Sequence, residues 1–193
     1  MADTAQTTPG AAEDDVFTFE SAANKEYPLA PQGQHDVIIA RALFQMRENS
    51  FKPEAGKQPT VQLMLQSRQQ YKAEDGTMKN YNLFKTMKIS DHPKSGMFEF
   101  FRDVLGGEVP LVEVDNADGT KSKRIKLERK TEKVEDGEDR IHLPQFENLE
   151  FAVIVKHEKK DDGSGKMRDF IDSVFASPEQ KASNLALFRA PQA

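Results

Sequence analysis

The clearest structural signal in this chain runs from residue 59 to residue 67 and reads PTVQLMLQS. Apolar side chains stand at every second position, with amides and a thioether between them. Because successive side chains of a strand point to opposite faces, the stretch predicts a β-strand with one buried face and one polar, uncharged face. The expected buried set is Val61, Leu63 and Leu65, and the opposite set is Gln62, Met64 and Gln66.

Two more strands are expected beside this one. Residues 35–44 are apolar on much of both faces, as in a barrel strand, and residues 81–87 alternate again after a turn centred on Glu74-Asp75-Gly76. In residues 81–88 each of the two faces holds an aromatic ring beside a lysine, so either orientation exposes such a pair. One face carries Tyr81, Leu83, Lys85 and Met87, and the other carries Asn82, Phe84, Thr86 and Lys88.

A short amphipathic helix is expected next. Pro93 suits a first helical turn, Ser90 or Asp91 suits the N-cap, and the glycines at 106 and 107 suit the end of the helix. The apolar residues repeat at helical spacing, which predicts core packing rather than a ligand site. They are Met97, Phe100, Phe101, Val104 and Leu105.

Two final strands are expected at residues 149–155 and 167–174, joined by a polar loop from Lys159 to Lys166. The resulting order is three strands, one helix and two strands. This is the chain order of the OB-fold, a five-stranded barrel that binds oligonucleotides or oligosaccharides. We therefore expect a mainly β domain over residues 31–176, with the helix between strands three and four.

Three segments are additional to that plan. Residues 1–30 are predicted to form a flexible acidic arm, in which only Val16, Phe17 and Phe19 are large and apolar. Residues 108–143 are predicted to form an inserted β-hairpin arm with its turn near Asp118-Gly119. Residues 177–193 are predicted to form a C-terminal tail with one or two short helical turns.

Composition narrows the class of protein. A chain of 193 residues with 37% apolar residues has enough material for one core. The net charge of −5 is located in residues 1–30, which contain six acidic residues and one lysine, so the remainder is neutral. The chain has no cysteine, no apolar run long enough to span a membrane and no signal-peptide pattern, which predicts a cytoplasmic protein, in the host cytoplasm if it is viral.

Short patterns then carry a family resemblance. The chain has Pro31-Gln-Gly33 before a strand, Ser95-Gly96 at a helix start, and an alternating run from Leu149 to His157 before a glycine-rich turn. This layout resembles phage and prophage OB-fold single-stranded DNA-binding proteins over roughly residues 16–175. The resemblance implies a role in phage-type DNA replication or recombination. Many such proteins end in an acidic, aromatic tail, whereas this chain carries its acidic segment at the N-terminus, where it is a candidate docking site for replication or recombination proteins.

A single strand offers phosphates and free base faces, so basic side chains beside exposed rings are what non-sequence-specific binding needs. The glutamines of residues 59–67 are candidates for base or phosphate contacts, although ordinary solvated polar residues are the favoured interpretation. For the aromatic residues, core packing is the competing interpretation. The candidate nucleic-acid-binding residues are Arg41, Arg47, Phe51, Arg68, Tyr71, Lys72, Lys79, Tyr81, Phe84, Lys85, Lys88, Lys123, Arg124, Lys126 and Arg168.

Other classes of function remain open at this stage. The four histidines are scattered without metal-ligand spacing, so we expect no enzyme activity, no cofactor and no metal, with a metal-dependent nuclease as a minor alternative. A protein that uses the same barrel for assembly, including a virion-associated structural protein, is the main alternative to DNA binding. The sequence leaves open whether the chain forms a homo-oligomer.

Overall fold

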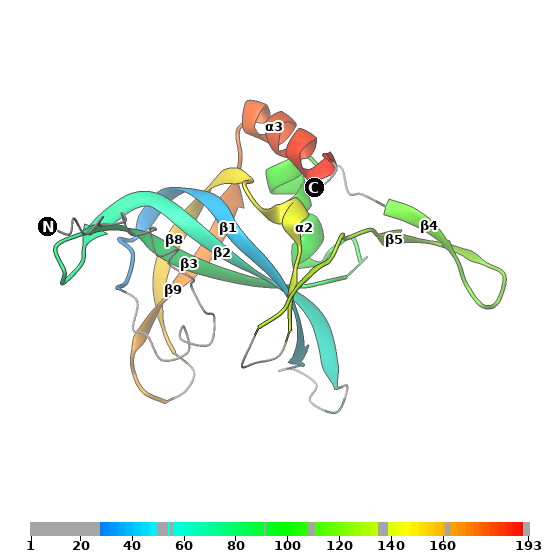
Figure 1. Ribbon diagram of the computed structural model, residues 1–193, viewed down its shortest axis with the longest axis horizontal. Coiled ribbons are helices and arrows are strands. Elements are labelled where there is room, and N and C mark those ends of the chain that lie inside the picture. The colour runs from blue at the N-terminus through cyan, green and yellow to red at the C-terminus, as the bar shows by residue number, and fades with distance from the viewer. Residues whose placement is uncertain are drawn as a thin grey trace, which may run out of the picture.

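The computed structural model describes residues 28–49, 54, 56–90, 92–107, 111–134, 139–160 and 163–190. These residues form one large antiparallel sheet, a separate two-stranded ribbon and two α-helices (Figure 1). The protein is therefore mainly β, as predicted. Most of the predicted acidic arm, residues 1–27, lies outside the described part of the chain, as does Phe51.

Three long strands form an antiparallel meander. They are β1 (Gly33–Glu48), β2 (Lys57–Lys72) and β3 (Met78–Lys88). The register places Ile39 opposite Leu65, and Leu65 opposite Leu83, so the buried face predicted from residues 61–65 continues across all three strands. Each strand is longer than predicted, and β1 continues beyond the expected end at residue 44 to include Arg47.

The turn between β2 and β3 is held by the side chain of Asp75. Its Oδ1 accepts hydrogen bonds from the Thr77 amide at 2.9 Å and the Thr77 hydroxyl at 2.6 Å. These bonds lower the pKa of Asp75 to about 2 because they stabilise the charged carboxylate. Asp118 and Thr120 repeat the arrangement at the same two distances in the second hairpin, and both turns contain a glycine with positive φ.

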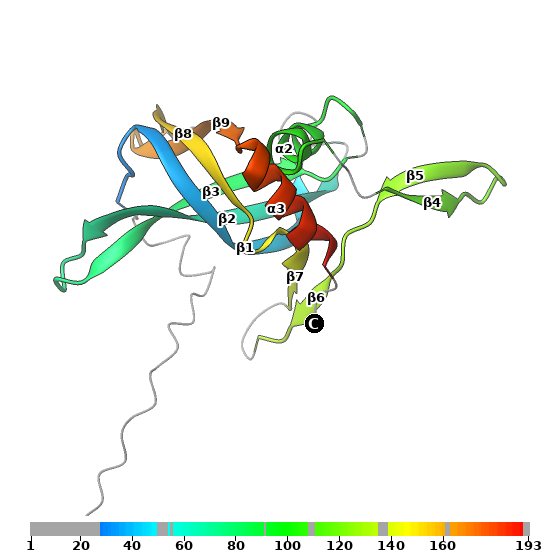
Figure 2. The same cartoon turned by 90° about the horizontal axis from the view of Figure 1, so that it is seen from above.

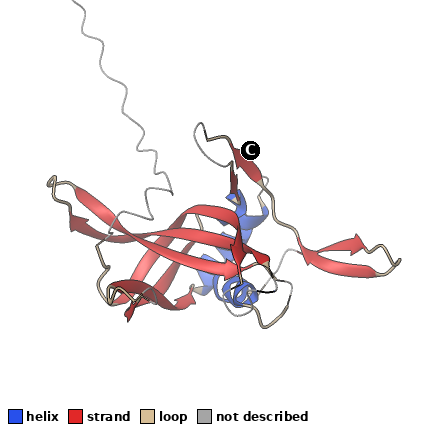
Figure 3. Cartoon of the chain, turned by 90° about the horizontal axis from the view of Figure 1, so that it is seen from below, coloured by secondary structure: helices blue, strands red, loops and turns tan. Residues whose placement is uncertain are grey.

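The last two strands complete one end of the sheet. β8 (Glu150–Lys159) pairs with the first half of β1, with Val155 opposite Gly33, and β9 (Met167–Phe175) pairs with β8. The two outermost strands, β3 and β9, approach each other to within 8 Å between Cα atoms. Seen from below, the strands form a curved sheet with the helices beside it (Figure 3). Among the described residues β3 and β9 form no hydrogen-bonded ladder, so the sheet is curved but is not assigned as a closed barrel.

The segment 108–143 is only partly the predicted arm. β4 (Leu111–Asp115) and β5 (Lys121–Ile125) form the predicted hairpin, which projects away from the rest of the molecule (Figure 2). The chain then returns through β6 (Lys130–Glu132) and β7 (Arg140–His142), and β7 pairs with the second half of β1. The prediction of a single hairpin is therefore corrected to two hairpins, because strands of three residues carry no recognisable alternation.

The predicted helix is α2 (Gly96–Leu105), and its apolar stripe is buried as expected. Its N-cap is Ser95, whose Oγ accepts a hydrogen bond from the Phe98 amide at 3.4 Å. The predicted cap at Ser90 or Asp91 is wrong, because Pro93 belongs to the turn before the helix rather than to its first turn. Ser90 Oγ instead accepts a hydrogen bond from the His92 amide at 3.2 Å.

The C-terminal segment forms a 12-residue helix, α3 (Pro178–Arg189), where one or two short turns were expected. A capping box between Ser177 and Gln180 begins it. Phe188 is 1% exposed, and its ring centroid lies 5.3 Å from that of Phe146. The helix therefore contributes to the core.

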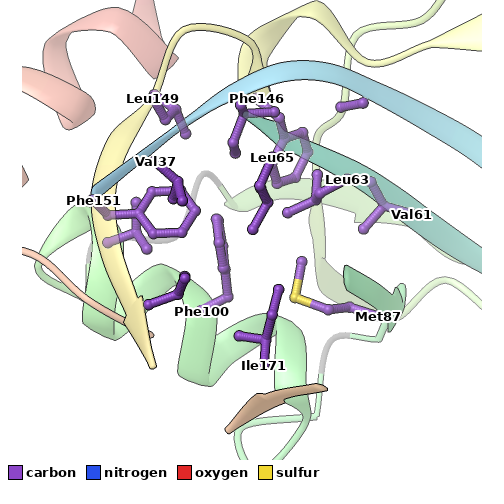
Figure 4. Close-up of a cluster of buried hydrophobic side chains, with 14 of the residues drawn as sticks. Val37, Val61, Leu63, Leu65, Met87, Phe100, Phe146, Leu149, Phe151 and Ile171 are labelled. Atoms are coloured by element: carbon purple, nitrogen blue, oxygen red, sulfur yellow. The ribbon is translucent and has the colours of Figure 1, made fainter. Parts of the chain in front are cut away.

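One hydrophobic core lies between the sheet and the helices (Figure 4). It combines the inward faces of β1, β2 and β8 with the apolar stripe of α2 and with Phe146 from the 3-10 helix η2 (Pro144–Phe146). Asn184 on α3 is buried, where its amide donates to the Val104 and Glu150 carbonyls and its oxygen accepts from the Glu150 amide. In the described part of the chain, no helix has the length and apolar character needed to cross a membrane.

Candidate nucleic-acid interface

The side of β1, β2 and β3 that faces away from the core forms the candidate interface. On β2, the inward residues Val61, Leu63 and Leu65 are each 0% exposed, and the residues between them are half-buried. Residues opposite each other in the register share a face, so the pairing carries this surface onto β1 and β3. We call it the outer face, and its central residues are Arg41, Gln62, Met64, Gln66, Asn82 and Phe84.

Three of these residues form a row across the strands. Arg41 lies opposite Met64, and Met64 lies opposite Phe84, so a cation, a thioether and an aromatic ring follow one another at strand spacing. On β2 and β3, polar pairs lie on either side of this row, with Gln62 opposite Thr86 and Gln66 opposite Asn82. On β1 the same two rows continue into Leu43 and Ile38, so the polar groups that flank Met64 and Phe84 are confined to β2 and β3.

The charges of β2 and β3 are all of one sign. Their sequences contain no aspartate or glutamate but six lysine or arginine residues. A continuous strand pair without any carboxylate favours contact with an anion such as a phosphodiester chain. The six residues are Lys57, Arg68, Lys72, Lys79, Lys85 and Lys88. The sequence itself shows that β2 and β3 lack acidic residues, but charges summed over longer segments do not reveal it.

Several predicted contacts lie on or beside this face. Lys88 and Arg47 are exposed, and the Arg47 Nε donates to Gln45 Oε1 at 2.8 Å. Arg68 is also exposed, but it forms an ion pair with Glu150 at 2.7 Å. Arg41 is half-buried and lies close enough to Glu132 to help lower the pKa of that carboxyl.

Other predicted contacts lie on the opposite side of the sheet. Tyr81 packs against the core, and its ring centroid is 5.0 Å from that of Tyr71. Lys85 lies opposite the buried Leu63 on the core side, and burial lowers the pKa of its ammonium group while the nearby Glu99 opposes that change. These residues stay candidates from the sequence, but the fold does not bring them to the outer face.

The remaining predicted residues are dispersed. Lys123, Arg124 and Lys126 lie on or next to the projecting hairpin, where Arg124 donates to Asn116 Oδ1 at 3.4 Å. Lys79 pairs with Asp75 at 3.3 Å, and Arg168 pairs with Glu158 at 2.7 Å on β9. Lys72 is exposed near the β2–β3 turn.

The β6–β7 hairpin adds charged groups beside β1 that were not among the candidate binding residues. His142 on β7 lies opposite Leu43, and its Nε2 is 2.7 Å from Glu132 Oε2. This hydrogen bond is the main reason that the pKa of Glu132 is lowered. Lys130 and Arg140 share the hairpin, so the sheet beyond β1 carries both signs of charge. The cationic character is therefore concentrated on β2 and β3.

The histidines of the described residues serve structural contacts. His35 is buried and bonds Ser67 Oγ at 2.9 Å and the Pro31 carbonyl at 2.7 Å. His157 contacts the Ala30 carbonyl at 2.8 Å and thereby fixes the segment before β1. In the part of the chain that the structure describes, no group of three or more histidine, aspartate or glutamate side chains is placed to hold a metal ion.

Comparison of the chain with models of protein families, with curated proteins and with solved structures finds no significant match.

Proposed function

We propose that the chain binds single-stranded DNA across the outer face of β1, β2 and β3, without sequence preference in its backbone contacts. The observation that carries the proposal is the strand pair β2–β3. Its sequence has no carboxylate, and its outer face presents the exposed Lys88 two rows from the half-buried ring of Phe84. Cations exchange for the counterions of a phosphate chain, and a base stacked on a ring contributes ~1–3 kcal/mol.

The proposal includes the fold type. The strand order β3-β2-β1-β8-β9 and the approach of β3 to β9 support an OB-type barrel, and α2 follows the third strand as in that plan. In OB-folds the face of strands two and three binds oligonucleotides, which here is the outer face of β2 and β3. The resemblance to phage single-stranded DNA-binding proteins extends the proposal to replication or recombination.

Fluorescence anisotropy of labelled oligo-dT tests the proposal. We expect saturable binding at low ionic strength and a linear fall of log K with log salt, with a slope of about −0.7 for each phosphate contact. Duplex DNA of the same length is the comparison, and we expect weaker binding because its bases are not available for stacking. No binding of oligo-dT at low salt would reject the function and leave the assembly role as the alternative.

A further inference from the structure

Three polar side chains on and beside the outer face form a chain of hydrogen bonds that orients one amide. The Arg47 guanidinium can only donate, and its Nε bonds Gln45 Oε1 at 2.8 Å. The oxygen of Gln45 is thereby committed, so its Nε2 faces Gln62 and donates to Gln62 Oε1 at 3.0 Å. The consequence is that the Gln62 oxygen is occupied and its NH₂ group is left as a hydrogen-bond donor.

The Gln62 NH₂ group has no hydrogen-bond partner among the described residues, although the side chain is half-buried. It lies two positions from Met64 on β2, which places it about 7 Å along the strand from the Met64–Phe84 pair. On the other side of that pair stand Gln66 and Asn82, and the Asn82 Oδ1 is buried without a hydrogen-bond partner in the described part of the chain.

We infer that the outer face contains a pocket for one base, in which the base stacks on Phe84 and Met64 and the Gln62 NH₂ group donates to a carbonyl on its edge. This inference rests on the proposed function and refines it. Contacts to phosphate are the same for every base, whereas an oriented hydrogen-bond donor distinguishes one base from another. The pocket should therefore prefer a base with a carbonyl at C4 of a pyrimidine or C6 of a purine over one with an amine at that position.

The chemistry of the bases separates the two classes. Thymine and guanine present O4 and O6 as acceptors, whereas cytosine and adenine present N4 and N6 amino groups as donors. A donor facing a donor leaves both groups unsatisfied when water is excluded, which costs more than the lost hydrogen bond. The Gln66 and Asn82 amides are not oriented by any such chain of hydrogen bonds among the described residues, so the preference is assigned to Gln62 alone.

The experiment compares short homo-oligomers of about 12 nucleotides, a length suited to one domain of this type. Thymine and cytosine are the matched pair because both are pyrimidines with similar stacking surfaces. We expect oligo-dT to bind about 5- to 10-fold more tightly than oligo-dC, as one net hydrogen bond implies. Oligo-dU keeps O4 and lacks the methyl group, so it should bind like oligo-dT.

Two variants locate the effect. Gln62→Glu replaces the donor with an acceptor, and it should lower affinity for both oligomers while reversing their order. Gln70→Glu, on the same strand near the β2–β3 turn, adds the same charge and should leave the dT to dC ratio unchanged. Gln45→Met breaks the orienting chain without removing Gln62, so the ratio should fall toward one with little change in thermal stability.

The outcomes separate this inference from the proposed function. If no oligomer binds, the proposed function fails and the pocket fails with it. If oligo-dT and oligo-dC bind equally, and Gln62→Glu leaves them equal, binding stands and the base pocket is rejected. If wild-type protein prefers oligo-dT but Gln45→Met keeps that preference, the orienting role of Gln45 is rejected.

Discussion

On one side of β1 lie β2 and β3, which contain six lysine or arginine residues and no carboxylate, and on the other side lie β8 and β9. In the second pair the strands carry their own acids, which bond their cations, with Lys156 at 2.8 Å from Asp172 and Arg168 at 2.7 Å from Glu158. Both pairs are antiparallel and both pack on the same core. The difference teaches that the net charge of this chain says little about its partners. The charge carried by each individual strand is more informative.

Both strand pairs pack on one hydrophobic core, and substitution of Phe188 is the strongest test of that arrangement. Replacing Phe188 with alanine should lower the free energy of unfolding by about 3–5 kcal/mol, because the ring is fully buried between Phe101 and Phe146. Urea denaturation measures the change. Leu187→Ala is the control, since that neighbouring side chain is 44% exposed and should cost about 0.5 kcal/mol or less. Equal effects would mean that α3 is not part of the core.

A second test concerns the aromatic ring of each strand pair. Phe84→Ala should weaken oligo-dT binding by ~1–3 kcal/mol through lost stacking, with folding retained because the ring is on the outer face. Phe170 on β9 is 42% exposed and provides the matched control. If Phe170→Ala weakened binding more than Phe84→Ala, the interface would have to be moved to β8–β9.

Substitutions that neutralise cations should also distinguish the proposed interface from the β8–β9 strand pair. Arg41→Gln with Lys88→Gln should lower oligo-dT affinity about 10-fold at low salt and reduce the salt slope by about 1.4, as expected for two lost contacts to a single strand. The matched pair Lys156→Gln with Arg168→Gln should change neither quantity much, because those cations lie on β8 and β9, outside the proposed interface. Anisotropy titrations at several salt concentrations give both values.

The smallest expected effect is on the pH dependence of folding stability. A carboxyl in the β2–β3 turn and one on β9 should contribute to it with opposite signs. Asp75 has a folded-state pKa of about 2, below its ordinary value of 3.8, so its stabilising contribution is present above about pH 4 and is lost as pH falls toward 2. Burial raises the pKa of Asp169 above 3.8, so its contribution is present below that pH and is lost as pH rises through the folded-state pKa.

Thermal melts of Asp75→Asn and Asp169→Asn against pH can separate the two carboxyls. The first variant should lose stability relative to wild type above pH 4 and approach it near pH 2. The second should approach or exceed wild-type stability toward neutral pH, because asparagine keeps an acceptor for the Ala30 amide without a buried charge. Parallel pH profiles for both variants would contradict these assignments.

The parts of the fold that the sequence could predict are those with a long periodic signal. Residues 61–66 predicted the buried face of β2, and the stripe from Met97 to Leu105 predicted α2. The β6–β7 return could not be predicted, because each strand has three residues and its pairing partner lies on distant β1. Phe188 gave no amphipathic pattern with its neighbours, so the burial of α3 depends on tertiary contacts alone.

The candidate site was harder to predict than the fold. Tyr81 and Lys85 share one strand face with Leu83 and Met87. Only the register to β2 shows that this face is the inward one. A lysine is compatible with such a position because its long stem can lie against apolar groups while the amine approaches solvent. Arg41 and Lys88 were recognised from their type, whereas the orienting contact from Gln45 to Gln62 required knowledge of which residues lie opposite each other.

The length of β1 has a consequence for how the polypeptide acquires its structure. Its first half pairs with β2 and with β8, and residue 33 lies opposite residue 155. A ribosome therefore releases the β1–β2–β3 meander long before the strand that covers its open edge has been made. Contacts so distant along the chain slow folding, and an uncovered edge invites association with other nascent chains. We therefore expect the chain to depend on chaperones during synthesis, because β1 must pair with strands on both of its edges.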